Sequence, residues 1–238
     1  MSGHSHWSGI KHKKALVDSK RGQIFTKLGR AISVAARSGR GNPEFNPNLR
    51  LAIEKARSFN MPNDKIDNSI KKGLGEGAQN KLEEAEYEGL GPFGTMLIIK
   101  AITDNKNRTV SDIRRLLEKH QGKMADGGIS WNFKRVGIIE ILPDLDRKEE
   151  IINIAIENEA ADIFEKEDNS VQIISDLENF NSLKEIFSHY PIRESGLSYM
   201  PKNPITLDSE QKVKYDKLVE SLIEHPDVQE VFDNVAEM

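Results

Sequence analysis

The order of elements predicted between residues 136 and 199 constrains the fold of this chain more than any other feature of its sequence. Apolar runs of strand length alternate there with segments of helical period, and Asp168-Asn169 marks a tight turn between two of the runs. The order is strand, helix, strand, strand, helix, strand, which is the arrangement of a ferredoxin-like split βαβ unit. The predicted strands are 136–142, 162–165, 171–174 and 192–199, and the predicted helices are 147–158 and 178–189.

The segments that flank this unit are incomplete by themselves. They predict strands at 96–102, 129–133 and 228–232, a helix from about Thr109 with Asp112 in the capping-box position, and a helix at 209–224. Because isolated strand pairs are only marginally stable in water, we expect the two pieces to share one core. Residues 135–204 would then form a domain inserted into a discontinuous domain of residues 82–134 and 205–238, with Pro201 and Pro204 in the return linker.

Three short helices are predicted before these domains. The first covers about 19–38, the second begins at Asn46-Pro47 with the asparagine as its cap, and the third runs from near Pro62 to Gly73. Their apolar positions repeat at helical spacing, so they can pack as a small bundle, and the polar stretch 75–85 predicts a linker. The predicted fold class is therefore α+β: a basic three-helix bundle at 1–81, followed by two α/β ferredoxin-like domains, one inserted in the other.

Charge is distributed unevenly along the chain. The 238 residues include 34 Lys and Arg and 38 Asp and Glu, which gives a net charge of −4. Residues 1–75 hold 15 of the basic side chains and 5 of the acidic ones, whereas the remainder holds 19 and 33. A segregated basic segment attracts polyanions, and the phosphate backbone of nucleic acid is the commonest of these. The alternative is a solvated basic helical face that binds no ligand.

The first forty residues concentrate the groups that suit nucleic acid. Nine of them are Lys or Arg against a single acid, Asp18, and the start of the chain also carries three histidines and a tryptophan among Gly and Ser. Lys and Arg neutralise phosphates, Trp7 can stack on a base, and the basic residues of helix 19–38 fall largely outside its apolar stripe. The predicted nucleic-acid-binding residues are His4, His6, Trp7, Lys11, His12, Lys13, Lys14, Lys20, Arg21, Lys27, Arg30, Arg37 and Arg40.

Little in the sequence supports an enzyme, a cofactor site or a metal site. There is no cysteine, no HExxH motif and no convincing Ser/His/Asp group. The pair His4 and His6 lacks a fixed third ligand, so we interpret it as a polar contact to phosphate or base. Gly89, Gly91 and Gly94 have the GxGxxG spacing, but they precede a strand instead of opening a helix, which favours a turn.

Two further features bear on ligands and location. The stretch 104–109, DNKNRT, lies where a strand enters a helix, and it suits either an anion or an ordinary turn and cap. No apolar run approaches the ~20 residues that span a bilayer, and the start of the chain resembles neither a secretory signal nor an amphipathic presequence. We therefore expect a cytoplasmic protein without membrane contact.

Several motifs resemble the YebC family. They are MSGHSHWSGIKHKKALVDSKRGQIFTKLGR, NPNLRLAIEKARSFNMPNDKI, IKKGLGE, YEGLGPFG, TDNKNRT and GGISWNF, and the match runs essentially end to end. Bacterial members are usually called probable transcriptional regulators, and the mitochondrial relative is a translational activator of cytochrome c oxidase. The resemblance implies a non-enzymatic cytoplasmic protein with one helical and two α/β domains that acts on nucleic acid or on the ribosome. Leu90 and Phe93 depart from the family, which often has an aromatic residue and a glycine at these places.

Neither the residues nor the resemblance decides which polymer is bound. A DNA reader needs base-reading side chains on a presented helix, whereas helix 19–38 offers mainly Lys and Arg, which position a protein without specifying sequence. A tail of Gly, His, Trp and Lys suits irregular RNA, including ribosomal RNA, at least as well. Two hypotheses follow, a DNA-binding transcriptional regulator and a ribosome-associated translation factor. Contact of the acidic C-terminal domains with the ribosome or another protein is a third, compatible with either.

Overall fold

The computed structural model describes residues 14–39, 41–75, 81–125, 127–143, 147–166 and 168–236, with side chains from residue 21 onward. The chain divides into two compact units, and each is described by itself. The first unit spans Met1–Trp131 and Asn203–Met238, and the second spans Asn132–Lys202. Within the described residues, no helix has both the length and the apolar character needed to cross a membrane.

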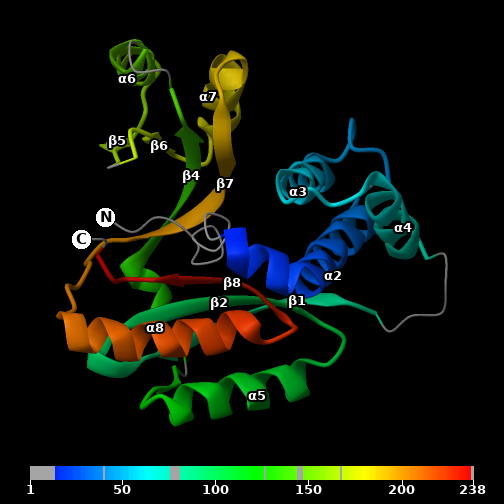
Figure 1. Ribbon diagram of the computed structural model, residues 1–238, viewed down its shortest axis with the longest axis vertical. Helices are drawn as coiled ribbons and strands as arrows, with labels where there is room; N and C mark the ends of the chain where they lie inside the picture. The colour runs from blue at the N-terminus through cyan, green and yellow to red at the C-terminus, as the bar shows by residue number, and fades with distance from the viewer. Residues whose placement is uncertain are drawn as a thin grey trace. The chain divides into compact units, whose positions relative to one another are not determined.

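The first unit begins with three helices, α2 (Lys14–Ser38), α3 (Pro47–Ser58) and α4 (Asn63–Gly73) (Figure 1). The predicted start of α3 is confirmed, because the Asn46 side chain accepts a hydrogen bond from the Leu49 amide at 3.1 Å and Pro47 occupies the first turn. The predicted end of α4 at Gly73 is confirmed as well.

Small residues allow α2 and α4 to pack closely. A Cβ atom added to Gly73 would lie 2.3 Å from the Ser33 carbonyl oxygen, and one added to Gly29 would lie 2.9 Å from the Ser69 hydroxyl oxygen. The Ser33 hydroxyl also donates to the Ser69 carbonyl oxygen at 2.8 Å. These contacts advance in the same direction along both helices, so α2 and α4 run parallel and their register is fixed.

A four-stranded antiparallel sheet follows, in the order β3-β1-β2-β8. Its strands are β1 (Glu83–Leu90), β2 (Met96–Thr103), β3 (Lys123–Met124) and β8 (Val228–Asp233), and its helices are α5 (Lys106–Lys119) and α8 (Ser209–Glu224). Both of these helices lie on one side of the sheet, and α2 lies on the other (Figure 1). Leu97 and Val231 of the sheet share a core with Leu117 of α5 and Leu218 of α8. The C-terminal helix and strand therefore complete a sheet whose other strands precede the second unit.

Strand β1 corrects the predicted linker. The sequence predicts a polar linker over 75–85, whereas β1 begins at Glu83 and pairs with β2 along its whole length. The acid-rich sequence EEAEYEGL hides this strand because most of its side chains are exposed or half-buried, and only Gly89 is buried. A pattern that depends on apolar alternation does not detect such a strand.

Two more boundaries differ from the prediction. Helix α5 begins at Lys106 instead of Thr109, because the Asn105 side chain caps it by accepting from the Arg108 amide at 3.0 Å. The strand predicted at 129–133 is replaced by a 3₁₀ turn, η2 (Ser130–Asn132), directly before the next strand.

The loop between β1 and β2 confirms the turn interpretation of the glycine-rich motif. It contains a 3₁₀ turn, η1 (Pro92–Gly94), in which Phe93 has a φ of 62°. This left-handed conformation costs a residue other than glycine roughly 1–2 kcal/mol, which accounts for the glycine that the family resemblance leads one to expect there. Gly91 has no room for a side chain, because an added Cβ would lie 2.3 Å from the Thr95 hydroxyl oxygen.

The second unit is a four-stranded antiparallel sheet in the order β5-β6-β4-β7. Its elements are β4 (Phe133–Ile141), α6 (Lys148–Glu157), β5 (Asp162–Glu165), β6 (Val171–Ser175), α7 (Phe180–Ile186), a 3₁₀ turn η3 (Phe187–His189) and β7 (Ile192–Pro201). Ile139 and Ile173 of the sheet form a core with Ile151 of α6 and Leu183 of α7. Both the order along the chain and the order in the sheet are ferredoxin-like, and the predicted α+β fold class is confirmed.

The chain enters and leaves the second unit at neighbouring points. Phe133 pairs with Pro201 across β4 and β7, and the Lys202 amide donates to the Asn132 carbonyl oxygen at 2.7 Å. Adjacent ends are what an inserted domain requires. The compact unit begins at 132 and ends at 202, close to the predicted boundaries of 135 and 204. That the insert folds independently is a proposal.

Candidate nucleic-acid interface

Helix α2 carries all of the predicted site residues that are described, but it is not presented to a ligand along its length. Between residues 24 and 36 only Thr26 is exposed, and the others are buried or half-buried. The sequence predicts one packed face and one basic face. The structure packs both, because α3, α4 and the C-terminal part of the unit all contact α2.

Lys27 is buried, with 4% of its surface exposed. Its ammonium group donates to the carbonyl oxygens of Ile223 at 2.5 Å and Val228 at 2.6 Å. Ile223 lies in the last turn of α8, so the charge sits at the negative end of that helix dipole. We therefore correct the prediction for Lys27: its charge binds the C-terminal segment of the same chain and does not face a ligand.

Two other cations of the bundle make similar contacts. The Arg30 guanidinium lies 2.6 Å from the Asp227 carboxylate and donates to the Pro226 carbonyl oxygen at 2.9 Å. The Lys55 ammonium lies 2.5 Å from the Glu230 carboxylate. Part of the charge asymmetry along the chain is therefore satisfied internally, because the basic bundle docks on the acidic C-terminal segment.

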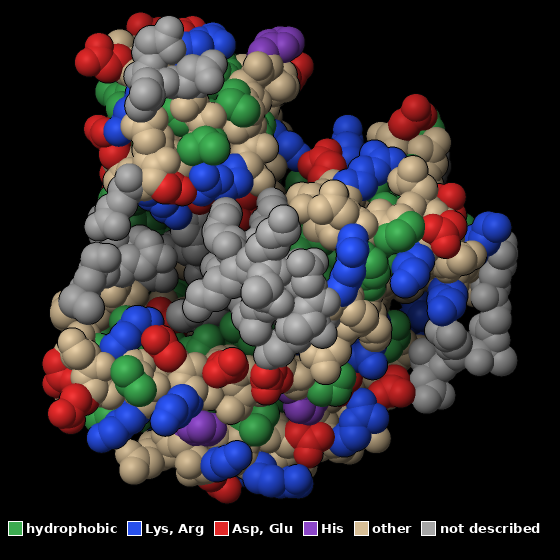
Figure 2. Space-filling view, in the orientation of Figure 1, with side chains coloured by type: hydrophobic (Ala, Val, Ile, Leu, Met, Phe, Trp, Pro, Cys, Tyr) green, Lys and Arg blue, Asp and Glu red, His purple; other side chains and the backbone are tan. Residues whose placement is uncertain are grey.

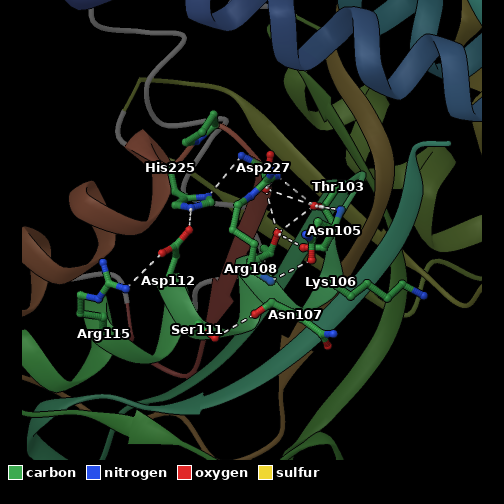
Figure 3. A network of polar contacts seen from close by, with 12 residues as sticks. Thr103, Asn105, Lys106, Asn107, Arg108, Ser111, Asp112, Arg115, His225 and Asp227 are labelled. Carbon is green, nitrogen blue, oxygen red and sulfur yellow. Dashed lines mark hydrogen bonds and ion pairs between the residues drawn. The ribbon is translucent and has the colours of Figure 1, made fainter. Parts of the chain in front are cut away.

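Asp227 is the centre of a polar network that joins α2, α5 and the start of β8. Figure 3 shows the part of this network around Arg108 and Asp227. Its carboxylate accepts hydrogen bonds from Arg30 at 2.6 Å and from Arg108 and Thr109 at 2.8 Å, with 2% of the side chain exposed. Burial alone raises the pKa of Asp227, but the hydrogen bonds from Arg108, Thr109 and Arg30 outweigh it and hold that pKa below its ordinary value. The DNKNRT stretch is thus a turn and cap whose arginine joins this network.

The remaining predicted residues fall in two groups. Arg21 is exposed, with its guanidinium carbon 5.5 Å from the centre of the Phe25 ring, and Arg37 is exposed and donates to the Leu82 carbonyl oxygen at 2.8 Å. Lys14 and Lys20 lie in α2, with side chains outside the described set. His4, His6, Trp7, Lys11, His12, Lys13 and Arg40 lie outside the described residues.

Sequence reasoning missed several exposed cations of α3 and α4. They are Arg50, Arg57, Lys65, Lys71 and Lys72. Figure 2 shows basic side chains distributed over the bundle among acidic ones. The signal that could have found the three lysines is the helical wheel of the third predicted helix, whose non-apolar positions carry them. The candidate interface therefore includes the outer surfaces of α3 and α4 as well as the first residues of α2.

His120 and His225 have structural contacts. His120 Nε2 lies 3.1 Å from the Ser221 hydroxyl, and burial, followed by repulsion from Lys119 and Lys217, lowers the pKa of His120. His225 Nδ1 accepts from the Asp227 amide at 3.2 Å. Across the described ranges, no group of three or more His, Asp or Glu residues is placed to hold a metal ion.

The chain consists of a basic helical domain followed by two α/β units, one of which is inserted in the other. This domain arrangement defines the class of protein. The chain belongs to the TACO1/YebC family: the sequence pattern of the family's N-terminal domain matches residues 5–76, and that of its second and third domains matches residues 82–235.

Known proteins resemble the chain over almost its whole length. It is 44% identical to a probable transcriptional regulatory protein of Caldanaerobacter subterraneus subsp. tengcongensis, covering 99% of this chain and 98% of the relative. It is 46% identical to one of Thermoanaerobacter pseudethanolicus, covering 99% and 97%. The crystal structure of a conserved hypothetical protein from Aquifex aeolicus matches with a TM-score of 0.86 and 41% identity, covering 98% of both chains.

Proposed function

We propose that this protein is a cytoplasmic, non-enzymatic regulator of gene expression that binds nucleic acid through its N-terminal helical domain, with DNA as the target. The observation that carries the proposal is the set of exposed cations on α2, α3 and α4, in a chain whose relatives are named probable transcriptional regulatory proteins. These cations supply the sequence-independent part of nucleic-acid affinity.

The arrangement of the bundle favours phosphate contacts over base reading. A helix that reads bases in the major groove must present one continuous face, and α2 is enclosed between residues 24 and 36. Lys and Arg on the outer surfaces position a protein on the backbone without specifying sequence. We therefore expect binding with little preference among sequences.

The second candidate is a translation factor that binds ribosomal RNA. RNA carries the same phosphates, and the His-, Trp- and Lys-bearing first residues of the chain suit unpaired bases. Crosslinking in cells separates the two functions: recovery of promoter DNA supports the regulator of transcription, whereas recovery of ribosomal RNA with comigration on ribosomes supports the translation factor.

Replacement of Lys11, Lys13, Lys14 and Lys20 with glutamine tests the proposed binding surface. Affinity should fall for all sequences, and the dependence of log K on log salt should become shallower by roughly 0.9 per lost duplex phosphate contact or about 0.7 per single-strand contact. Fluorescence anisotropy over a salt series measures both quantities.

The matched control removes four exposed cations from α5 and α8. These are Arg114, Lys119, Lys214 and Lys217, each replaced with glutamine. The control should bind within a few-fold of the unmodified protein, because the same charge is removed away from the bundle. Equal loss in both variants would contradict the proposal, and no loss in either would exclude these four lysines from the binding surface.

A further inference from the structure

Three exposed cations follow the junction between α2 and α4. They are Arg21 of α2 and Lys65 and Lys72 of α4, and we call them the seam row. They differ from Lys27, Arg30 and Lys55, which bind the C-terminal segment. Among the described residues, none of the seam row makes an ion pair.

One aromatic ring organises the first two members of the row. The Lys65 ammonium lies 5.1 Å from the centre of the Phe25 ring, and the Arg21 guanidinium carbon lies 5.5 Å from the same point. Phe25 is itself buried in the bundle core, so it is a fixed anchor for both head groups. Contacts of this kind hold a cation at modest cost and reduce the entropy lost when an anion binds.

The parallel packing of α2 and α4 sets the spacing of the row. Phe25 lies beside Lys65, and the Gly29–Ser69 contact continues the register, so Arg21 lies about one turn before Lys65 along the shared direction. Lys72 follows Lys65 by seven residues, which is two turns on the same face and a rise of ~10.5 Å. The backbone positions of the three residues therefore extend over roughly 16 Å along one line.

The acidic residues of α4 lie off this line. Asp64 is rotated by about 100° from Lys65 around the helix axis, and Asp67 by about 160°. Asn68 is the exposed residue that falls between Lys65 and Lys72 on the same face. An anion along the junction would thus meet cations and an amide before it meets a carboxylate.

We infer that the seam row binds phosphates along one strand of a nucleic-acid duplex. The inference rests on the proposed function and assigns it to named residues. Because a strand advances ~3.4 Å along the axis per phosphate, a row of roughly 16 Å covers about five base pairs. The sequence of α4, NDKIDNSIKKG, contains no aromatic residue, and the Phe25 ring beside the row is buried. Among the described residues this surface therefore has no exposed ring on which unpaired bases could stack, and a duplex backbone is the form it fits.

The test compares two triple variants that remove equal charge, one from the seam row and one from outside the bundle. The first replaces Arg21, Lys65 and Lys72 with glutamine, and its matched control replaces three exposed cations of α5 and α8, Arg114, Lys214 and Lys217. Each is titrated against a 20-base-pair DNA duplex, an RNA duplex of the same sequence and the corresponding single strands, over a salt series, with thermal melts to verify folding.

We expect the seam variant to bind a duplex roughly 100-fold more weakly at 0.1 M salt, with a salt slope about 2–3 smaller, since each lost phosphate contact contributes about 0.9. The control should change affinity by a few-fold only. The two duplexes carry the same phosphates, and the one that loses more affinity identifies the natural form. If the seam variant has a lower melting temperature than the unmodified protein, the double variant Lys65→Gln/Lys72→Gln takes its place. Its salt slope is expected to be smaller by about 2.

Three outcomes would overturn the inference. If both triple variants lose the same affinity, the row contributes only through the total charge of the protein. If the seam variant loses as much affinity for single strands as for duplexes, the row is not specific for a duplex. Retained binding by the seam variant, with loss on replacing Lys11, Lys13, Lys14 and Lys20, would refute the row while the proposed function stands. If neither the seam variant nor the variant lacking these four lysines loses affinity, the proposed function is refuted as well.

Discussion

At the scale of the residue, the cations of the bundle belong to two groups with opposite environments. Lys27 is enclosed and binds carbonyl oxygens at the end of α8, whereas Lys65 is exposed over an aromatic ring. Both are lysines in amphipathic helices with apolar residues nearby, so local pattern does not separate them. A buried ammonium persists only where several acceptors surround it, and those acceptors come from the far end of the chain.

Replacement of Lys27 with methionine should therefore reduce stability and leave binding unchanged. The carbonyl groups of Ile223 and Val228 lose a charged donor, which should lower the free energy of unfolding by about 2–4 kcal/mol. Urea unfolding at pH 7 measures the change, with Lys65→Met as the exposed control, expected within about 0.5 kcal/mol of the unmodified protein. A changed salt slope with unchanged stability would show that Lys27 faces the ligand after all.

At the scale of the element, one carboxylate holds together the segments that surround it. Asp227 precedes β8, and its hydrogen bonds reach α2 through Arg30 and the first turn of α5 through Arg108 and Thr109. The Asn105 cap places Arg108 and Thr109 in that turn, so the start of α5 and the network depend on each other. The DNKNRT motif accordingly has a structural explanation in the part of the chain described.

Asp227→Asn should destabilise the protein at pH 7 and make the free energy of unfolding less dependent on pH in the acid range. Removal of one partner leaves Arg30 and Arg108 with an uncharged acceptor, which should cost about 3 kcal/mol at pH 7. Because the folded pKa of Asp227 lies below its ordinary value of 3.8, its contribution is complete above that value and is lost as pH falls through the folded pKa.

Urea unfolding between pH 7 and pH 3 measures both effects. The unmodified protein should lose stability more steeply below about pH 4 than Asp227→Asn does. Asp112→Asn is the control, since Asp112 is 3.5 Å from His225 and partly exposed, and it should change stability at pH 7 by less than about 1 kcal/mol. Parallel acid limbs for Asp227→Asn and the unmodified protein would contradict the central role of Asp227.

At the scale of the whole molecule, the chain leaves one sheet unfinished, builds a second and then returns to complete the first. Strand β8 pairs with β2, and α8 contributes Tyr215 and Leu218 to the core beneath it. The basic bundle belongs to the same compact unit and binds the returning segment through Lys27, Arg30 and Lys55. Opposite charges at the two ends of the chain therefore contribute to the assembly of this unit.

Excision of residues 132–202, with a short glycine linker between Trp131 and Asn203, should leave a folded remainder. The excised piece should also unfold cooperatively by itself, because its ends are paired and its helices and sheet share one core. Truncation of residues 203–238 should instead unfold the first sheet while sparing the second unit. Circular dichroism melts of the three proteins measure these outcomes, and a remainder that unfolds on excision would contradict the insertion.

The sequence by itself determined the elements whose signals are local. The Asn46 cap, the stop at Gly73 and the ferredoxin-like order of the second unit follow from propensity, capping and hydrophobic period, which act within a few residues. The resemblance to the family likewise rests on motifs that can be read along the chain, and membership is confirmed. The acid-rich strand β1 was not predicted, because it is a strand through its pairing with β2 and not through its own sequence pattern.

Only the tertiary structure determined which charged side chains are buried and which are exposed. Whether Lys27 and Arg30 meet a nucleic acid or the end of α8 depends on residues almost 200 positions away, and no local pattern encodes that distance. The same holds for Lys65, which becomes a binding candidate because parallel packing of α2 and α4 brings it over Phe25 beside Arg21. Long-range docking fixes which charges are used to hold the protein together and which stay exposed to a ligand, because burial depends on what packs against a side chain.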